Sequence, residues 1–572
     1  MWKFSLRSYE AISWTAVAIT FVYVLIRLIR SRQKTFSYFK EIGIPGPEPS
    51  LIWGNLVEYH KKVKHPLAFF GALTTHLLEH VFASDIVQGF VHSVTEWGAK
   101  YGDVFGFYNG DLPMLVVKDL DFLTYIFVKN FKNFTDRGML MRTDQEHTVL
   151  RNSIINAKGA QWKRTRGCIS QAFTSSKLKQ VMPHLTESTD LFLETLGDLA
   201  DARRELAIHE PLQGLAMDFI GRAAFGLDCC FQRNPWHPFM QAAREVIHGV
   251  QTGPFHMIAH CTSTLPAIAS TILWLNEKLG SFTFSTFGEE TKKIVEMRLR
   301  NPEARRPDLL QIMLDASDKE GRQHNEDSKN RTSMTLQEVE LNTTVNLIGG
   351  FETTSAAMAY VFYVLAKYQD VQEKVRADVA SAVQEYGKIN YDAITSRMKY
   401  LRSVLDETLR IYPPGTAFTT RRAINDFEYN GVKYKAGTSI MAPTFNIHMD
   451  PRYWPEPNKF DPERFFDENV ASRACIAYQP FGAGPRNCVG ERMAILAITY
   501  TVARVVQKYR LTLGESQKQD RLGDSPRLGK RTLEKRDIYA FSSIVSGCYV
   551  VAGASASNAR QEVSNVSASV NS

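Results

Sequence analysis

A single cysteine stands on a strongly bent stretch of backbone in the segment FGAGPRNCVG, residues 481–490. Its three glycines let the chain turn tightly and approach a partner closely, and Arg486 adds a positive charge two residues before Cys488. The apolar periodicity of residues 489–509 predicts a helix directly after the cysteine. Unpaired N–H groups at a helix N-terminus favour the thiolate, which is the reactive and metal-binding form. We therefore expect Cys488 to be a thiolate open to a ligand.

Other uses of a cysteine fit this segment less well. A zinc site needs further Cys or His ligands at short spacing, and Cys475 alone does not supply them. A nucleophile needs a histidine base, which residues 481–490 lack, although a base can come from anywhere in the chain. A buried, inert cysteine is the commonest role of the residue, but it requires neither the glycines nor Arg486. The seven cysteines are odd in number and irregularly spaced, which predicts a reducing compartment and no disulfide framework.

The pattern F-x-x-G-x-R-x-C-x-G, met by Phe481, Gly484, Arg486, Cys488 and Gly490, resembles the haem-binding loop of the cytochrome P-450 haem-thiolate monooxygenases. The resemblance covers roughly residues 45–517 and is closest to the microsomal drug- and steroid-oxidising group that includes thromboxane synthase. It implies heme b with Cys488 as the axial thiolate on its iron, and Phe481 and Arg486 as cofactor-binding residues. The implied fold is mostly α with small β-sheets, the haem lying between a long central helix and the helix after the cysteine loop.

The segment GGFETTS, residues 349–355, interrupts a long apolar helix predicted at residues 336–368. Each glycine in a helix interior costs about 1 kcal/mol relative to alanine, so the weakening requires a reason. Small residues for tight packing are one reason; a bend is another, since Thr353 can donate back to the carbonyl of Gly349. The resemblance implies that Glu352 and Thr353 are the catalytic acid–alcohol pair that relays protons while dioxygen is activated.

Three further positions suit the carboxylates of a haem. Trp162 and Arg166 are spaced i and i+4 in GAQWKRTR, so they share one face of a helix, and Arg421 follows YPPGTAFTT. The arginine fork can bond both oxygens of a carboxylate. Each position taken alone is equally typical of a surface residue. The resemblance implies that all three bind haem propionates.

Glu407 and Arg410 in LDETLRIYPP are spaced i and i+3, so the two side chains can pair on a helix. By itself this spacing is typical of a surface ion pair worth less than about 1 kcal/mol. The resemblance implies a buried, structural pair instead, joined by Arg464 of DPERF.

The N-terminus carries an uncharged apolar run at residues 11–26, followed by Arg27, Arg30, Arg32 and Lys34. The flanking positive charges and the lack of a small-residue cleavage site favour a retained signal anchor over a cleaved signal peptide. We therefore expect residues 1–34 to form a transmembrane helix that leaves the catalytic part in the cytosol, and residues 35–55 to form a proline-rich hinge. The resemblance implies a single-pass protein of the endoplasmic reticulum membrane.

The catalytic domain is expected at residues 56–518, with an apolar insertion at 66–91. Strands are predicted in DVFGFYNG, in PMLVVKD, and on both sides of the turn at Asn430–Gly431. Residues 519–572 depart from the family's pattern and are expected to be an atypical, partly disordered tail.

The function implied is insertion of one oxygen atom from dioxygen into a lipophilic sterol, fatty acid or xenobiotic. Because the chain shows no flavin or nicotinamide motif, electrons are expected from an NADPH–haemoprotein reductase, with cytochrome b5 as a further donor. The net charge of +8 is spread along the chain and does not predict a nucleic-acid partner. A haem-thiolate isomerase or dehydratase acting on lipid peroxides, and a non-catalytic haem protein, are the alternatives.

Overall fold

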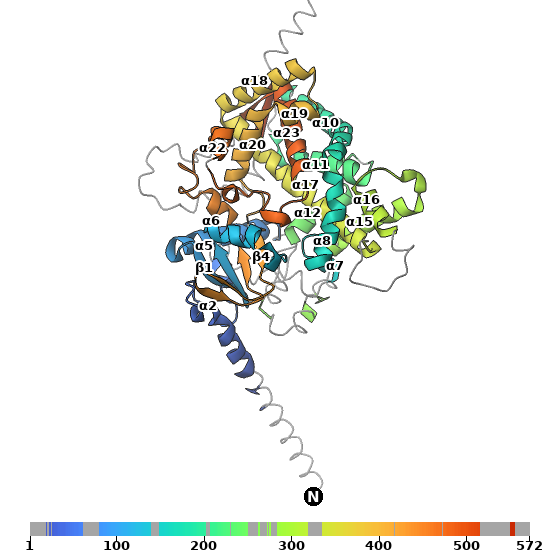
Figure 1. The fold of residues 1–572 in the computed structure, drawn as a ribbon. Helices are drawn as coiled ribbons and strands as arrows, with labels where there is room; N and C mark the ends of the chain where they lie inside the picture. Colours follow the sequence, from blue (N-terminus) through green and yellow to red (C-terminus); the bar gives the residue numbers. More distant parts are fainter. Residues whose placement is uncertain are drawn as a thin grey trace, which may run out of the picture.

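The computed structural model describes residues 19, 22–23, 26–60, 79–138, 148–201, 206–228, 230–249, 261–262, 271–272, 274–275, 283–318, 334–416, 418–471, 473–514 and 549–554. Most of the predicted anchor, residues 66–78 of the predicted insertion and most of the predicted tail lie outside these ranges. Within them, none of the helices combines the length and the apolar character that a membrane crossing requires. The helix that includes residues 26–36 projects from the body (Figure 1).

The elements have the following bounds. The longer helices are α5 (Glu79–Tyr101), α8 (Gly159–Ser170), α10 (Met182–Asp201), α11 (His209–Phe225), α12 (Pro238–Gly249), α15 (Thr283–Arg300), α16 (Leu309–Asp318), α17 (Leu336–Lys367), α18 (Gln369–Tyr386), α20 (Lys399–Ile411) and α23 (Glu491–Lys508). Short helices are α2 (Tyr38–Glu41), α3 (Leu56–His60), α6 (Leu120–Thr124), α7 (Thr148–Arg151), α9 (Ser175–Gln180), α19 (Tyr391–Ser396), α21 (Thr444–His448) and α22 (Asp467–Ala471). The strands are β1 (Val104–Asn109), β2 (Leu112–Val117), β3 (Leu206–Ala207), β4 (Thr420–Arg422), β5 (Phe427–Tyr429), β6 (Val432–Tyr434), β7 (Ser439–Met441), β8 (Tyr509–Leu513) and β9 (Tyr549–Ala554).

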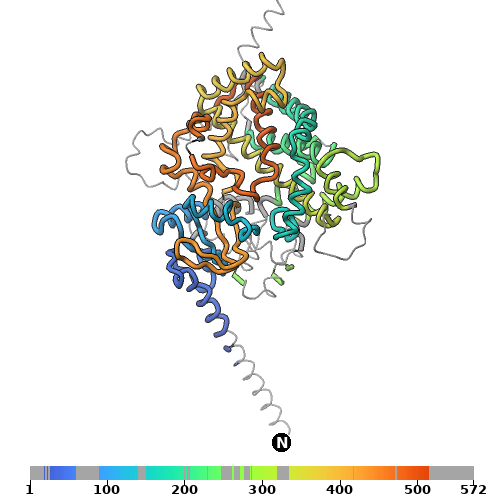
Figure 2. The backbone as a smooth tube through the Cα atoms, in the orientation of Figure 1, coloured from blue at the N-terminus to red at the C-terminus, as the bar shows by residue number. Residues whose placement is uncertain are grey.

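Helix α17 is the central element of the helical body (Figure 1) and matches the helix predicted from its apolar periodicity. It begins with a capping box, in which the Thr335 side chain accepts from the Glu338 amide and the Glu338 carboxylate accepts from the Thr335 amide. It packs against α11, α15, α20 and α23, and most of its side chains are buried. Figure 2 shows the backbone of α23 running beside it through the middle of the molecule.

A four-stranded sheet of order β1-β2-β7-β4 forms the second part of the molecule (Figure 1). β1 and β2 are the strands predicted in DVFGFYNG and PMLVVKD. They pair antiparallel from Val104↔Val117 to Asn109↔Leu112, and β7 joins β2 in parallel. β4, which carries Arg421, is antiparallel to β7. The predicted turn at Asn430–Gly431 connects β5 and β6, with φ values of 50° and 78°. This confirms the strand predictions and fixes Arg421 at the sheet edge.

Two segments were predicted to depart from the family's pattern, the insertion and the C-terminal tail. The described residues of both form a helix or a strand. Residues 79–91 of the predicted insertion are the first half of α5, whose Trp97 packs against Phe107 in the sheet with ring centroids 5.4 Å apart. From the predicted tail, β9 pairs antiparallel with β8, from Tyr509↔Ala554 to Leu513↔Val550. The predicted partly disordered tail therefore returns to the body with a strand.

A buried ion pair ties α20 to the irregular segment that follows α21. Arg410 donates to both carboxylate oxygens of Glu407, at 2.7 and 2.8 Å, and neither side chain has any exposed surface. Arg410 also donates to the carbonyl of His448 at 2.8 Å, and Nε of Arg464 lies 3.5 Å from Glu407 Oε1. The Asp461 amide donates to the same oxygen at 2.9 Å. These contacts join α20 to His448, 38 residues after Arg410, and to Asp461, 54 residues after Glu407.

Replacing Glu407 by glutamine tests this pair, because the change leaves the Arg410 guanidinium buried without a counter-charge. The free energy of unfolding, measured by urea denaturation, is expected to fall by about 3–5 kcal/mol. Glu463→Gln is the matched control: Glu463 pairs with Lys374 at 3.4 Å on the surface, and its loss should cost less than about 1 kcal/mol. Similar losses in both variants would contradict a structural role for the buried pair.

Candidate active site

The loop that carries Cys488 is held by a hydrogen bond between its two ends and packs closely against the carbonyl of Phe127. The Cys488 amide donates to the Phe481 carbonyl at 2.8 Å. Gly482 and Gly484 have φ values of +78° and +70°, in the region that favours glycine. A Cβ atom on Gly484 would lie 2.2 Å from the carbonyl oxygen of Phe127. The glycines therefore serve the loop's own conformation and its close packing.

His448 anchors the loop to α20 and was missed by sequence reasoning. Its ring bonds the Arg410 carbonyl through Nδ1 at 3.0 Å, and its Nε2 accepts from the Gln479 amide at 3.0 Å. Burial lowers the pKa of His448 to about 3, so the ring is neutral and can donate through one nitrogen while it accepts through the other. The Gln479 carbonyl in turn accepts from the Gly482 amide at 3.0 Å. This chain of hydrogen bonds connects the buried ion pair to the cysteine loop.

Cys488 has exposed surface, unlike the buried Cys168 and Cys261, although it lies deep among the surrounding residues. Gly490 caps α23, and its amide is hydrogen-bonded to the sulfur, as expected two residues before a helix. The expectation that these local groups alone favour a thiolate is not met. Burial raises the pKa of Cys488 and outweighs the lowering by the Gly490 amide and by Arg166 and Arg137. A bound cation is needed to complete the deprotonation, as at other metal-bound thiols.

One turn in the middle of helix α17 is exposed, whereas the residues around it are mostly buried. Thr353 and Gly349 are exposed, and the Thr353 hydroxyl donates to the Gly349 carbonyl at 2.6 Å, as the spacing predicts. Gly350 has a different role, because a Cβ atom there would lie 2.9 Å from the Ile220 side chain of α11. One glycine therefore allows close helix packing, and the other leaves the surface beside Thr353 open.

Glu352 lies next to Thr353 and contacts α11. Its Oε2 accepts from Gln213 Nε2 at 2.8 Å, and its Oε1 lies 3.5 Å from Nε2 of His209. Burial lowers the pKa of His209, and the charge of Glu352 opposes that effect. Gln213 in turn accepts from Arg244 Nε at 3.0 Å. The carboxylate is thus half-buried and fixed by α11, a partner that the sequence did not indicate.

Four arginines gather around the cysteine loop: Arg137, Arg166, Arg421 and Arg486. In the described part of the chain, none of the four forms an ion pair with a carboxylate. Burial, reinforced by the neighbouring guanidinium charges, lowers the pKa of Arg486 to about 9 and that of Arg137 to about 10. The same causes lower the pKa of Arg421 well below its ordinary value. The cluster therefore carries uncompensated positive charge.

Backbone carbonyls and aromatic rings hold Arg421 and Arg486. Arg421 donates to the carbonyls of Thr420 and Ala483, at 2.7 and 2.6 Å, and lies over the Phe127 ring, 4.5 Å from its centroid. Arg486 lies over the ring of Trp162, also at 4.5 Å.

Hydrogen bonds to carbonyls complete the placement of the cluster. Arg486 donates to the carbonyls of Ile155 and Ala157, and Arg137 donates to that of Phe418 at 2.6 Å. Arg166 donates to the carbonyl and the side chain of Asn487, at 2.6 and 3.0 Å.

The cluster fits an anionic group that lies beside the cysteine. The Nε atoms of Arg137, Arg421 and Arg486 are buried and have no hydrogen-bond partner. Buried donors without partners are costly, and guanidiniums bind carboxylates in pairs of hydrogen bonds. A haem would bring two propionates and an iron that requires one thiolate. The donor set is therefore suited to haem.

Arg137 is the arginine of this cluster that the sequence did not indicate. It follows FTD at the end of a loop and has no partner at helical spacing, so only the fold brings it to the cysteine. Trp162, Arg166, Arg421, Phe481 and Arg486 lie at or beside the cysteine loop. The described ranges contain no group of three or more His, Cys, Asp or Glu side chains that could hold a metal ion.

Two glycine substitutions separate backbone conformation from close packing in the loop. Gly482→Ala is expected to lower the free energy of unfolding by about 1 kcal/mol, because the positive φ is strained for alanine. Gly484→Ala adds the overlap with Phe127 and is expected to cost about 3 kcal/mol. Urea denaturation of both variants measures the difference. Equal losses of unfolding free energy in the two variants would show that the backbone around Phe127 can move to accommodate the added Cβ atom and that the close contact is not a constraint.

Comparison with known proteins agrees with this geometry. The family model for cytochrome P450 matches residues 73–535. Cytochrome P450 3A17 of Cavia porcellus is 30% identical over 521 residues, which are 90% of this chain and 94% of the relative. Cytochrome P450 3A28 of Bos taurus is 30% identical over 506 residues, 88% and 90% of the two chains. Lithocholate 6-beta-hydroxylase of Mesocricetus auratus is 30% identical over 505 residues, 87% and 90%. The chain belongs to the cytochrome P450 family, the haem-dependent monooxygenases whose cofactor is held by a cysteine thiolate.

Proposed function

We propose that the chain is a membrane-anchored monooxygenase of lipophilic molecules, with Cys488 as the axial ligand of heme b. One observation carries this proposal: an accessible cysteine at the start of a helix lies near four guanidiniums that form no ion pair with a carboxylate of the described residues. Haem supplies the redox centre at which dioxygen is reduced by electrons from outside the chain.

In this proposal the arginine cluster binds and orients the cofactor. Arg421 and Arg486 direct buried Nε donors to the propionates, and Arg137 adds a third. Arg166 contributes charge next to the cysteine, while Trp162 keeps Arg486 in place by stacking. Two propionates would offset two of the four positive charges and so reduce the mutual repulsion of the guanidiniums, and cofactor binding would therefore also stabilise the fold.

Thr353 and Glu352 handle protons in the proposed reaction. The Thr353 hydroxyl donates to the Gly349 carbonyl, and a hydroxyl can rotate to donate to or accept from a reacting oxygen. Glu352 holds or releases a proton at its carboxylate, which Gln213 and His209 fix on the side of α11. The presence of both residues favours monooxygenation over peroxide isomerisation, which requires no proton delivery to dioxygen.

The substrate class is a lipophilic sterol, fatty acid or xenobiotic. Ile155 and Phe418 are exposed apolar side chains whose carbonyls bind Arg486 and Arg137, so apolar surface adjoins the cofactor-binding groups. One relative is named for 6-beta-hydroxylation of lithocholate. These observations support an apolar substrate site with few polar contacts.

Location and electron supply follow from the N-terminal sequence and the relatives. We place the chain in the endoplasmic reticulum membrane, anchored by residues 1–34, with its catalytic domain in the cytosol. An NADPH–haemoprotein reductase donates electrons at a basic face near the cysteine loop, and cytochrome b5 is a second donor. Exposed Lys163 of α8 and exposed Arg492 of α23 support such a face.

Cys488→Ser tests the axial ligand. The variant is expected to lose the thiolate-type carbon monoxide difference spectrum of the reduced protein, because a serine hydroxyl cannot supply the anionic sulfur. Cys475→Ser is the control, since Cys475 is also exposed but lies outside the loop, and it should retain the spectrum. A thiolate-type spectrum in Cys488→Ser would refute the assignment.

Thr353→Val tests the proton relay and leaves the side-chain shape nearly unchanged. With lithocholate as the probe substrate, product formed per NADPH consumed is expected to fall by about 100-fold, because proton delivery is lost while electron supply continues. Thr343→Val is the control: Thr343 makes the same type of bond to the Val339 carbonyl, at 2.9 Å, at a buried position of the same helix. An unchanged product ratio in Thr353→Val would exclude the relay.

A further inference from the structure

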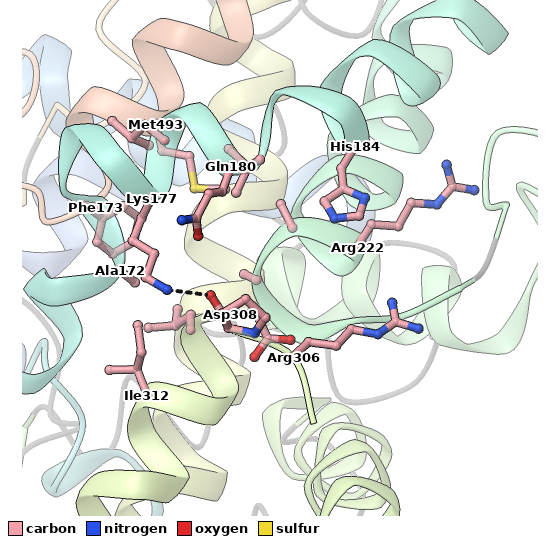
Figure 3. Close-up of a pocket in the computed structure, with 16 residues that line it drawn as sticks. Ala172, Phe173, Lys177, Gln180, His184, Arg222, Arg306, Asp308, Ile312 and Met493 are labelled. Atoms are coloured by element: carbon pink, nitrogen blue, oxygen red, sulfur yellow. Dashed lines mark hydrogen bonds between the residues drawn. The ribbon is translucent and has the colours of Figure 1, made fainter. Parts of the chain in front are cut away.

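A cavity of about 160 Å³ lies on the outer side of the cysteine loop. α9 and the start of α10 form one wall, the end of α11 and the segment before α16 form the other, and Met493 of α23 closes one end. Figure 3 shows that its lining is divided, with Phe173, Met493 and Ile312 at one end and His184, Arg222 and Arg306 at the other. None of these residues belongs to the haem-binding set described above.

The apolar end is in direct contact with the cysteine loop. Phe173 packs against Gly490, where a Cβ atom would lie 3.7 Å from the Phe173 ring. The Phe173 carbonyl accepts from Arg492 of α23 at 3.4 Å. Leu178 and Met493 are buried beside it, whereas Ile312 is half-buried and faces the cavity. An apolar group at this end would be removed from water and would rest on the residues behind Cys488.

The opposite end is cationic. Arg306 is exposed, and its guanidinium has no ion-pair or hydrogen-bond partner among the described residues. Arg222 is bound to Glu187 at 2.9 Å. The carboxylate of Asp308 is occupied by two hydrogen bonds from Arg298, at 3.0 and 2.7 Å.

His184 lies at the cationic end of the cavity and Lys177 lies near the apolar end (Figure 3), and the two side chains differ in charge. Burial lowers the pKa of His184; the charges of Arg306 and Arg222 add to this effect, and those of Glu187 and Asp308 oppose it. The imidazole is therefore neutral at pH 7 and offers an N–H donor. Lys177 is bound to the Pro307 carbonyl at 3.0 Å, the dashed line in Figure 3. The carbonyl does not neutralise Lys177, which remains a second cation of the lining. Arg306 differs from Lys177 and Arg222 in that its guanidinium has no partner among the described residues.

We propose that this cavity is a second ligand site, for a small amphipathic anion whose apolar body rests on Phe173 and Ile312 and whose carboxylate or sulfonate pairs with Arg306. Apolar burial at one end and a guanidinium without a partner at the other complement such a molecule, whereas a neutral or cationic molecule cannot form a charge-assisted pair with Arg306. The site is separate from the proposed substrate site and does not depend on the proposed reaction.

Octanoate is the probe, with 1-octanol as the uncharged analogue. Equilibrium dialysis of each radiolabelled compound against the haem-loaded full chain, with the same detergent on both sides, measures binding. Arg306→Glu is expected to weaken octanoate binding about tenfold, because it reverses the charge that pairs with the carboxylate. It should leave octanol binding unchanged. Arg300→Glu is the matched control: Arg300 is exposed and paired with Glu296 outside the cavity, so octanoate binding should change less than about twofold.

Ile312→Phe provides a second test, because it fills the apolar end and keeps the charges. It is expected to abolish saturable binding of octanoate at this site, with the melting temperature of the variant showing that the fold is retained. Octanoate binding that both Arg306→Glu and Ile312→Phe leave unchanged would place the ligand elsewhere and overturn the proposal. Equal losses in Arg306→Glu and Arg300→Glu would also overturn it, since they would reflect net charge alone.

Discussion

Uncompensated positive charge around the cysteine loop is the constraint on which the active site depends. Arg137, Arg166, Arg421 and Arg486 are held by carbonyl oxygens and aromatic rings, which fix their positions but do not neutralise them. Burial lowers the pKa of all four, and mutual repulsion adds to this effect at Arg137, Arg421 and Arg486. Burial also raises the pKa of the Cys488 thiol. Both costs are relieved by one occupant, an iron porphyrin with two carboxylates.

The rest of the fold holds this charged region rigid. The buried Glu407–Arg410 pair fixes the segment from His448 to Asp461. The neutral His448 ring accepts a hydrogen bond from the Gln479 amide and so connects this segment to the cysteine loop. On the other side, the approach of Gly350 to Ile220 brings α17 close to α11, and Thr353 lies in the one accessible turn. A cofactor held by charge on rigid supports needs few contacts from mobile loops, which are then free to fit the substrate.

Local signals in the sequence predicted much of this arrangement. The periodicity of residues 336–368, the turn at Asn430–Gly431 and the back-bond from Thr353 to Gly349 each depend on neighbours within a few residues, and the structure has all three. The failures depend on distant contacts. Arg137, His448 and the α11 partners of Glu352 reach the site only through the fold. The pKa of Cys488 was expected to fall because of the helix terminus and the charge of Arg486. It rises instead, because burial by the surrounding protein opposes the local groups. Strand β9 was missed because its partner β8 lies far away in sequence.

Extended X-ray absorption at the iron edge of the haem-loaded chain tests the central claim most directly. If the thiolate of Cys488 holds the iron, the first coordination shell must contain one sulfur together with the porphyrin nitrogens. A first shell made only of nitrogen and oxygen would contradict the account, because the arginine cluster would then bind a haem that the cysteine does not hold.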